Sequence, residues 1–222
     1  MARQLTFDWP TGVALGREDF FVSPANAQAY AMIGAPEAWP DRKLILMGPT
    51  GSGKSHLCRV VQTQIDAVLL RADDLPDTLP HAGRNVIVED MESLPAARQE
   101  FMFHLHNHLR NTQGFLLMTA QTPPSRWPLS LPDLASRMQA AAIAPIDDPD
   151  DALLSALMMK LMADRQIMPP AALVTYILPR IERSFAAVAK IVADLDAQSL
   201  ATGRPMNRAL AATLLDKAGD TG

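Results

Sequence analysis

The sequence predicts an α/β fold, in which helices cover both faces of a mostly parallel five-stranded sheet, followed by a small α-helical subdomain. The first observation is a glycine-rich loop between a short apolar run and a helical stretch. The second is a set of five short apolar runs separated by helical or loop stretches, at residues 44–47, 67–70, 86–88, 115–118 and 142–146. The third is a change to a helical pattern after residue 147. Short unbroken runs of Val, Ile and Leu are typical of strands buried on both sides.

The glycine-rich loop predicts a phosphate site. It is an unbroken G-x-x-x-x-G-K-[ST] pattern made of Gly48, Pro49, Thr50, Gly51, Ser52, Gly53, Lys54 and Ser55. Glycines let backbone N–H groups curl around phosphate oxygens, and the helix that begins near His56 points its positive end at the same anion. Lys54 supplies a charge for the β- and γ-phosphates, and the Ser55 hydroxyl is suited to Mg²⁺. The alternative, a chance glycine-rich turn, does not account for the strand and helix on either side.

A pair of carboxylates ends the third apolar run. Glu89 and Asp90 follow Val86-Ile87-Val88 directly. Ligands of open α/β sheets lie beyond the carboxyl ends of the strands, and two adjacent acids there need a cation or hydrogen-bond donors. We expect Glu89 to hold Mg²⁺, mainly through water, and Asp90 to orient an attacking water. The alternative is an ordinary solvated strand end.

The chain beyond residue 147 predicts helices. Asp147-Asp148-Pro149-Asp150-Asp151 is typical of a helix start, because acids and proline are both favoured there. Leucines and methionines then recur at helical spacing, and further helices are expected at 171–177, 183–201 and 206–217.

Composition narrows the class of partner. The formal net charge is −4, and lysines and arginines form no cluster, which disfavours direct gripping of duplex DNA. No apolar run reaches the roughly 18 residues that span a bilayer, and the first residues lack the pattern of a secretion signal. The single cysteine, Cys58, cannot form an internal disulfide. We therefore expect a cytoplasmic protein that acts on proteins or nucleotides.

The order of these features resembles the AAA+ ATPases of the DnaA/Hda family, and the local sequences are most similar to the regulatory inactivator of DnaA (Hda). The resemblance covers residues 4 to about 217 and implies a P-loop NTPase AAA+ core with an α-helical lid. It implies a clamp-binding peptide at 1–12, the nucleotide-binding core at 13–147 and the lid at 148–222.

The resemblance also implies roles for particular residues. Phe21 and Val22 match the segment that lines the adenine pocket, although simple core packing is the alternative. Thr119, at the end of the fourth apolar run, matches the residue that senses the γ-phosphate. Arg137, in Leu134-Ala135-Ser136-Arg137-Met138, matches the arginine finger that reaches a neighbour's nucleotide, and a surface charge is the alternative. Arg183 matches the lid residue that contacts the nucleotide of its own chain.

The first residues resemble the sliding-clamp-binding peptide of Hda-like proteins. Gln4 would hydrogen-bond at the rim of a pocket, while Leu5, Phe7 and Trp9 would fill apolar subsites. The alternative is an N-terminal strand packed on its own core. The chain reaches Gly222 soon after the expected lid with no basic recognition helix, which favours the regulator over the initiator.

The resemblance therefore implies a regulator that binds ADP or ATP with Mg²⁺ and contacts both DnaA and the DNA-loaded sliding clamp, the β subunit of the polymerase. There it would stimulate ATP hydrolysis by DnaA. Glu89 stands where the family usually has Asp, so we expect at most weak ATP hydrolysis by the chain itself. The alternatives are a self-contained AAA+ ATPase acting as a homo-oligomer, and a helicase-loader-like protein that binds single-stranded DNA.

Overall fold

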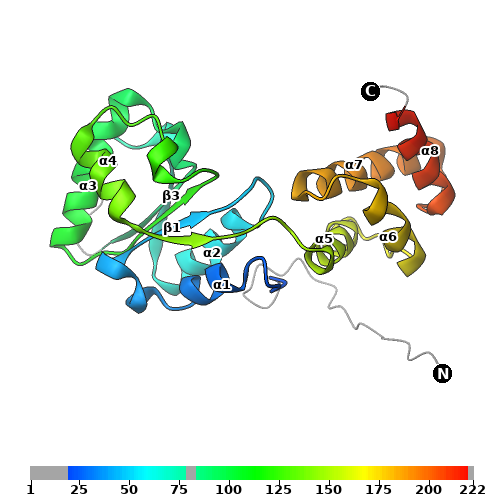
Figure 1. Cartoon of the computed structure of the whole chain (residues 1–222), viewed down its shortest axis with the longest axis horizontal. Helices are drawn as coiled ribbons and strands as arrows, with labels where there is room; N and C mark the ends of the chain where they lie inside the picture. Colours follow the sequence, from blue (N-terminus) through cyan, green and yellow to red (C-terminus); the bar gives the residue numbers. More distant parts are fainter. Residues whose placement is uncertain (1–19, 79–83, 220–222) are drawn as a thin grey trace.

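The computed structural model describes residues 20–78 and 84–219, and a five-stranded parallel sheet is the centre of this part of the chain (Figure 1). The strand order is β2-β3-β4-β1-β5, and every pairing is parallel. The strands are β1 (Lys43–Met47), β2 (Ala67–Arg71), β3 (Asn85–Glu89), β4 (Leu116–Ala120) and β5 (Ala142–Pro145). Each overlaps one of the predicted apolar runs, so the predicted sheet is confirmed.

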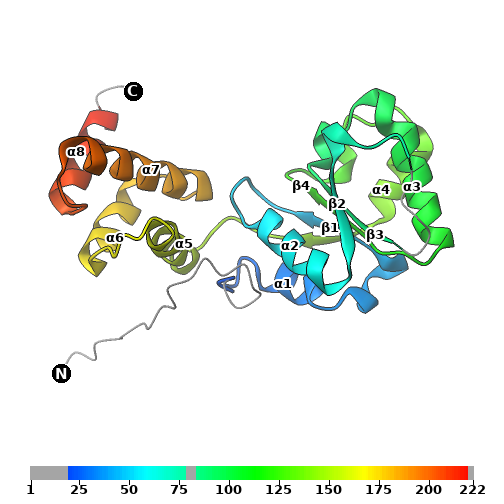
Figure 2. The same cartoon turned by 180° about the vertical axis from the view of Figure 1, so that it is seen from behind.

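Two hydrophobic cores lie on the two faces of the sheet, because neighbouring strand residues point to opposite sides. Ile45 packs on one face with α3 (Gln99–Asn111) and α4 (Pro132–Ala140). Leu44 and Leu46 pack on the other face with α1 (Ala27–Ile33) and α2 (Lys54–Gln64). Figure 2 shows the α2 face from behind, with α3 and α4 beyond the sheet. The layers are those expected of a parallel sheet.

The helical subdomain forms its own core beside the sheet, on the far side of the link that follows β5 (Figures 1 and 2). Its helices are α5 (Asp151–Ala163), α6 (Ala171–Ile177), α7 (Phe185–Thr202) and α8 (Arg208–Gly219). Side-chain caps fix the starts of α5 and α7. Asp150 Oδ1 accepts the N–H of Leu153 at 2.7 Å, and Ser184 Oγ accepts that of Ala187 at 3.1 Å.

Short helical turns connect these elements. They are η2 (Pro36–Ala38), η3 (Pro40–Arg42), η4 (Ala72–Asp74), η5 (Met91–Ser93), η6 (Ala96–Arg98), η7 (Pro124–Arg126) and η8 (Leu178–Arg180). Within the described residues, no helix is both long and apolar enough to cross a membrane.

A small apolar cluster joins the two bodies. Ala25 of the core packs with Leu153 and Phe185, the latter at the start of α7. The carbonyl of Ala25 also accepts the N–H of Asp147 at 2.8 Å, just after β5. These contacts place the first turn of α7 over the loop that follows β1, which extends toward α7 in Figure 1.

Candidate nucleotide site

The loop after β1 has a backbone that requires its glycines. Gly51 and Gly53 have φ values of +80° and +90°, in the left-handed region that other residues rarely adopt. A Cβ atom on Gly53 would lie 2.8 Å from Cε2 of Phe20, and one on Gly48 would lie 2.8 Å from Cβ of Ile146. Side chains are therefore excluded sterically, and α2 begins directly after the loop with its positive end toward it.

Lys54 lies against the loop rather than in solvent. Its Nζ donates to the carbonyls of Gly48 at 2.8 Å and Pro49 at 2.9 Å, and the residue is only 9% exposed. Burial lowers the pKa of Lys54, and the carboxylates of Glu92 and Asp90 partly offset that effect. A buried ammonium is stabilised by an added anion, so phosphate at this loop would be favoured.

Two hydroxyls complete the loop. Ser52 Oγ is buried and has no hydrogen-bond partner among the described residues, so its donor is free for an anionic ligand. Ser55 is exposed in the first turn of α2. No group of three or more His, Cys, Asp or Glu in the described part of the chain could hold a metal ion. A Mg²⁺ ion here would take most of its ligands from phosphate oxygens and water, as Mg²⁺ usually does.

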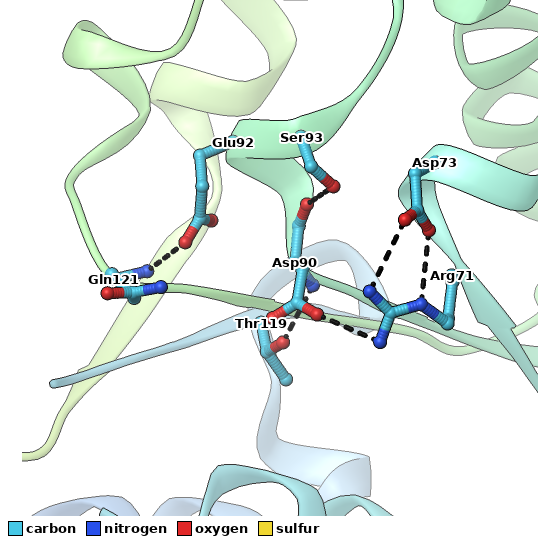
Figure 3. Close-up of polar contacts among 7 residues, drawn as sticks. All are labelled: Arg71, Asp73, Asp90, Glu92, Ser93, Thr119 and Gln121. Atoms are coloured by element: carbon cyan, nitrogen blue, oxygen red, sulfur yellow. Dashed lines mark hydrogen bonds and ion pairs between the residues drawn. The ribbon is translucent and has the colours of Figure 1, made fainter. Parts of the chain in front are cut away.

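The acidic end of β3 is tied to β4 by Thr119. Asp90 has a φ of +61°, and its N–H donates to Thr119 Oγ at 3.0 Å (Figure 3). The carboxylate of Asp90 pairs with Arg71 at 3.2 Å, and Arg71 also pairs with Asp73 at 3.1 Å. Glu89, at the end of β3, is half-buried. The predicted acids and the predicted sensor thus come together at the carboxyl edge of the sheet.

The segment before α1 supplies an aromatic side chain to the loop. Phe21 and Val22, the predicted adenine contacts, are each 43% exposed. The preceding residue, Phe20, is the one that packs against Gly53 of the loop. Its ring stacks on that of His56, with 5.9 Å between the ring centroids, so the predicted site residue His56 lies at this side of the loop.

A cavity of about 410 Å³ separates the phosphate loop from the lid. Pro49 and Thr50 line it on one side, and the start of α7 and Lys190 line it on the other. Arg183, the predicted lid contact, pairs with Asp151 at 2.9 Å, and its side chain is 64% exposed. Arg183 is not among the residues lining this cavity, in which Lys190 is the cation contributed by the lid.

Arg137 lies on α4, with its guanidinium carbon 5.0 Å from the centroid of the Phe103 ring. Burial lowers the pKa of Lys43, and the charge of Arg137 adds to that effect. Lys43 begins β1 and donates its Nζ back to the carbonyl of Asp41 at 3.2 Å. The ends of this strand are roughly 13 Å apart. Arg137 is in the last turn of α4, and β5 begins directly afterwards with Ala142, which pairs with Leu44 near the amino end of β1. Arg137 therefore lies toward that edge of the sheet, whereas the phosphate loop follows the carboxyl end of β1.

One carboxylate at the site carries no obvious signal in the sequence. Glu92 lies on η5, and its Oε1 accepts the N–H of Gln121 at 2.9 Å. The side chain of Gln121 in turn accepts the hydroxyl of Thr50 at 2.9 Å. Only the proximity of Glu92 to the pair Glu89 and Asp90 along the chain hints at this position. The predicted clamp contacts Gln4, Leu5, Phe7 and Trp9 lie outside the described residues.

The sheet, the helices on its two faces and the phosphate loop make up the AAA+ P-loop NTPase fold. Domain III of the replication initiator DnaA from Thermotoga maritima has the same fold, with a TM-score of 0.75 at 19% identity over 94% of this chain and 98% of that one. A RuvB from Thermotoga maritima matches with a TM-score of 0.67 at 17% identity, over 90% of this chain and 70% of that chain.

The sequence relatives of the chain include DnaA proteins. The chain is 24% identical to the chromosomal replication initiator protein DnaA of Cutibacterium acnes over 89% of its length, and 21% identical to that of Nautilia profundicola over 84%. It spans about half the length of these curated relatives, 45% and 48% respectively. No protein-family model matches the chain. The chain is thus a distant homologue of the AAA+ domain of DnaA.

Proposed function

We propose that this chain is an adenine-nucleotide-binding regulator of replication initiation. With the DNA-loaded sliding clamp, it stimulates ATP hydrolysis by DnaA and so inactivates the initiator. The chain binds ADP or ATP at the loop after β1, where Ser55 and Glu89 hold Mg²⁺. Arg137 acts on the nucleotide of the neighbouring DnaA rather than on the nucleotide of its own chain.

The position of Arg137 carries this proposal. Its guanidinium stacks on Phe103, and the last turn of α4 that holds it leads into β5 at the edge of the sheet opposite the phosphate loop. An arginine so placed does not reach the phosphates of its own chain, but it is available to a molecule docked on that side. Guanidinium groups suit this role because their planar donors match charge spread over phosphoryl oxygens.

The phosphate loop is the evidence for the nucleotide-binding part of this proposal. Ser52 offers an unused donor and Lys54 a buried cation, and both gain from an anion. A DnaA of Aquifex aeolicus with bound AMPPCP has a related fold, with a TM-score of 0.66 at 15% identity over 84% of this chain and 66% of that one. The same type of ligand is our expectation for this chain.

The experiment that tests the proposal incubates ATP-loaded DnaA with this chain and with clamp loaded on DNA, and measures the nucleotide left on DnaA. We expect conversion to ADP only when chain and loaded clamp are both present. Equal conversion in the absence of the chain would contradict the proposal.

A self-contained ATPase is the second candidate, and it is favoured by the presence of a full set of site features in one chain. The chain has its own phosphate loop, its own acidic strand end and a cavity under its own lid. In this reading Arg137 would meet the nucleotide of an identical neighbour. Substantial ATP turnover by the purified chain without DnaA, lost in Arg137→Ala, would select this candidate.

Changing both Gln4 and Leu5 to Ala is expected to remove binding to the sliding clamp while nucleotide affinity stays at the wild-type level. The reason is that a short extended peptide depends on a few side chains entering pockets. Surface plasmon resonance on immobilised clamp measures the first quantity. Unchanged clamp affinity in the double variant would contradict the peptide assignment.

Lys190→Gln is expected to weaken nucleotide binding more than Arg183→Gln does. Lys190 lines the cavity beside the phosphate loop, and within residues 20–78 and 84–219 its partner is Asp194, in an exposed ion pair. Arg183 is paired with Asp151 and is not among the residues that line the cavity. Fluorescence titration with a labelled ADP compares the two variants, and a larger loss in Arg183→Gln would contradict this expectation and favour Arg183 as the lid contact.

A further inference from the structure

The two carboxylate oxygens of Glu92 differ: one accepts a hydrogen bond, and the other has no partner among the described residues. It lies on η5, immediately after the left-handed residue Asp90. Its Oε1 accepts the backbone N–H of Gln121, which follows β4, at 2.9 Å (Figure 3). Its Oε2 is buried and has no hydrogen-bond partner among the residues that the structure describes. A buried carboxylate oxygen without a donor or cation is costly, so this oxygen is suited to a partner that a ligand brings.

Glu92 is linked to the phosphate loop by a short chain of hydrogen bonds. Gln121, which fixes Glu92 Oε1, accepts the hydroxyl of Thr50 from the loop at 2.9 Å. The N–H of Gly48, at the start of the loop, donates to the carbonyl of Ala120 at 3.1 Å. Among the acids that raise the pKa of Lys54 against the effect of burial, Glu92 is the strongest. The free oxygen of Glu92 therefore belongs to the same small region as the phosphate-binding lysine.

Asp90 is in a different situation, although it is the acid that the sequence pattern singles out. Its carboxylate is paired with Arg71 at 3.2 Å, and its side chain is 37% exposed. Arg71 also holds Asp73, so a fixed cation already satisfies the Asp90 carboxylate. Within the described part of the chain, Asp90 has an ion-pair partner in Arg71, whereas Glu92 has none and its Oε2 also lacks a hydrogen-bond partner.

A divalent cation would offset the negative charges of Glu92 and of a bound phosphate at this position. A nucleotide phosphate bound at Lys54 would bring negative charge close to Glu92, and two anions repel unless a cation lies between them. Lys54 already donates to the carbonyls of Gly48 and Pro49. Mg²⁺ is bound in such sites by one or two carboxylates together with phosphate oxygens and several waters.

We propose that Glu92, together with Glu89 and Ser55, holds the divalent cation of the bound nucleotide, and that Asp90 does not. Glu92 acts through the water shell of the ion, with Gln121 keeping the carboxylate oriented. This inference rests on the proposed nucleotide binding and adds a metal-holding residue to it. The chemistry that the ion supplies is neutralisation of phosphate charge.

The test compares metal affinity in the wild-type chain, Glu92→Gln and Asp90→Asn, each saturated with ADP. Both substitutions replace a carboxylate by an amide of the same shape, and Glu92→Gln keeps an oxygen for the Gln121 N–H. Electron paramagnetic resonance of free Mn²⁺ gives the affinity for the ion. We expect Glu92→Gln to weaken Mn²⁺ binding about tenfold, and Asp90→Asn to leave it close to the wild-type value.

ADP affinity without metal is the second readout. Because Glu92→Gln removes a negative charge near the phosphates, metal-free ADP binding is expected to stay equal or become tighter, which also shows that the variant is folded. Unchanged Mn²⁺ affinity in Glu92→Gln, or an equal loss in Asp90→Asn, would overturn the inference while leaving nucleotide binding intact. Failure of the wild-type chain to bind ADP at all would overturn the proposed function, and this inference with it.

Discussion

Lys54→Ala is expected to weaken ADP and ATP binding by about two orders of magnitude, because it removes charge-assisted hydrogen bonds to the phosphates. The ammonium lies within the loop, bonded to the carbonyls of Gly48 and Pro49, so it is already close to where a phosphate would bind. Displacement of a fluorescent ADP by unlabelled nucleotide measures the affinity.

Two controls separate loss of the ligand contact from loss of the fold. Lys160→Ala removes a lysine from α5, which is not among the residues lining the cavity, and should bind nucleotide as the wild type does. Thermal unfolding of Lys54→Ala without nucleotide shows whether the loop survives the loss of its two internal bonds. A folded Lys54→Ala variant with wild-type affinity would mean that the phosphates bind elsewhere.

Arg137→Ala is expected to reduce stimulation of DnaA by about a thousandfold, the lower end of what an arginine finger contributes to phosphoryl transfer. Nucleotide binding by the chain itself should be unchanged, because Arg137, in the last turn of α4, lies toward the amino edge of the sheet and the loop follows the carboxyl end of β1. Single-turnover hydrolysis of ATP on DnaA, with chain and loaded clamp in excess, measures the effect.

The matched variant is Arg137→Lys. It keeps the charge and loses the planar fork, so it should remain well below wild type. Arg204→Ala, at an exposed position between α7 and α8, should stimulate as the wild type does. Full stimulation by Arg137→Ala would exclude this residue from the neighbour's site.

The sequence predicted the elements of the fold because their signals are local. Five apolar runs became five parallel strands, and the run before Gly48 leads into the glycine loop as expected. The strand order was not predictable from these runs. β1 lies between β4 and β5, and such pairings depend on packing across the whole chain rather than on any local pattern.

The site was predicted where a motif exists and missed where contacts are long-range. Glu92 is fixed by Gln121, a residue 29 positions away, and no spacing rule connects the two. Phe20, which no sequence pattern singles out, packs on Gly53 of the loop, and the adenine contacts assigned to Phe21 and Val22 stay predictions. The roles of Arg137 and Arg183 concern a bound nucleotide and a neighbour, so they stay predictions.

Isothermal titration of the folded wild-type chain with ADP and Mg²⁺ tests the central claim most directly, namely that the loop between β1 and α2 binds the phosphates of an adenine nucleotide. The account predicts saturable heat with one ADP per chain, which disappears in Lys54→Ala. Absence of saturable heat from well-folded wild-type protein, with either ADP or ATP, would contradict it.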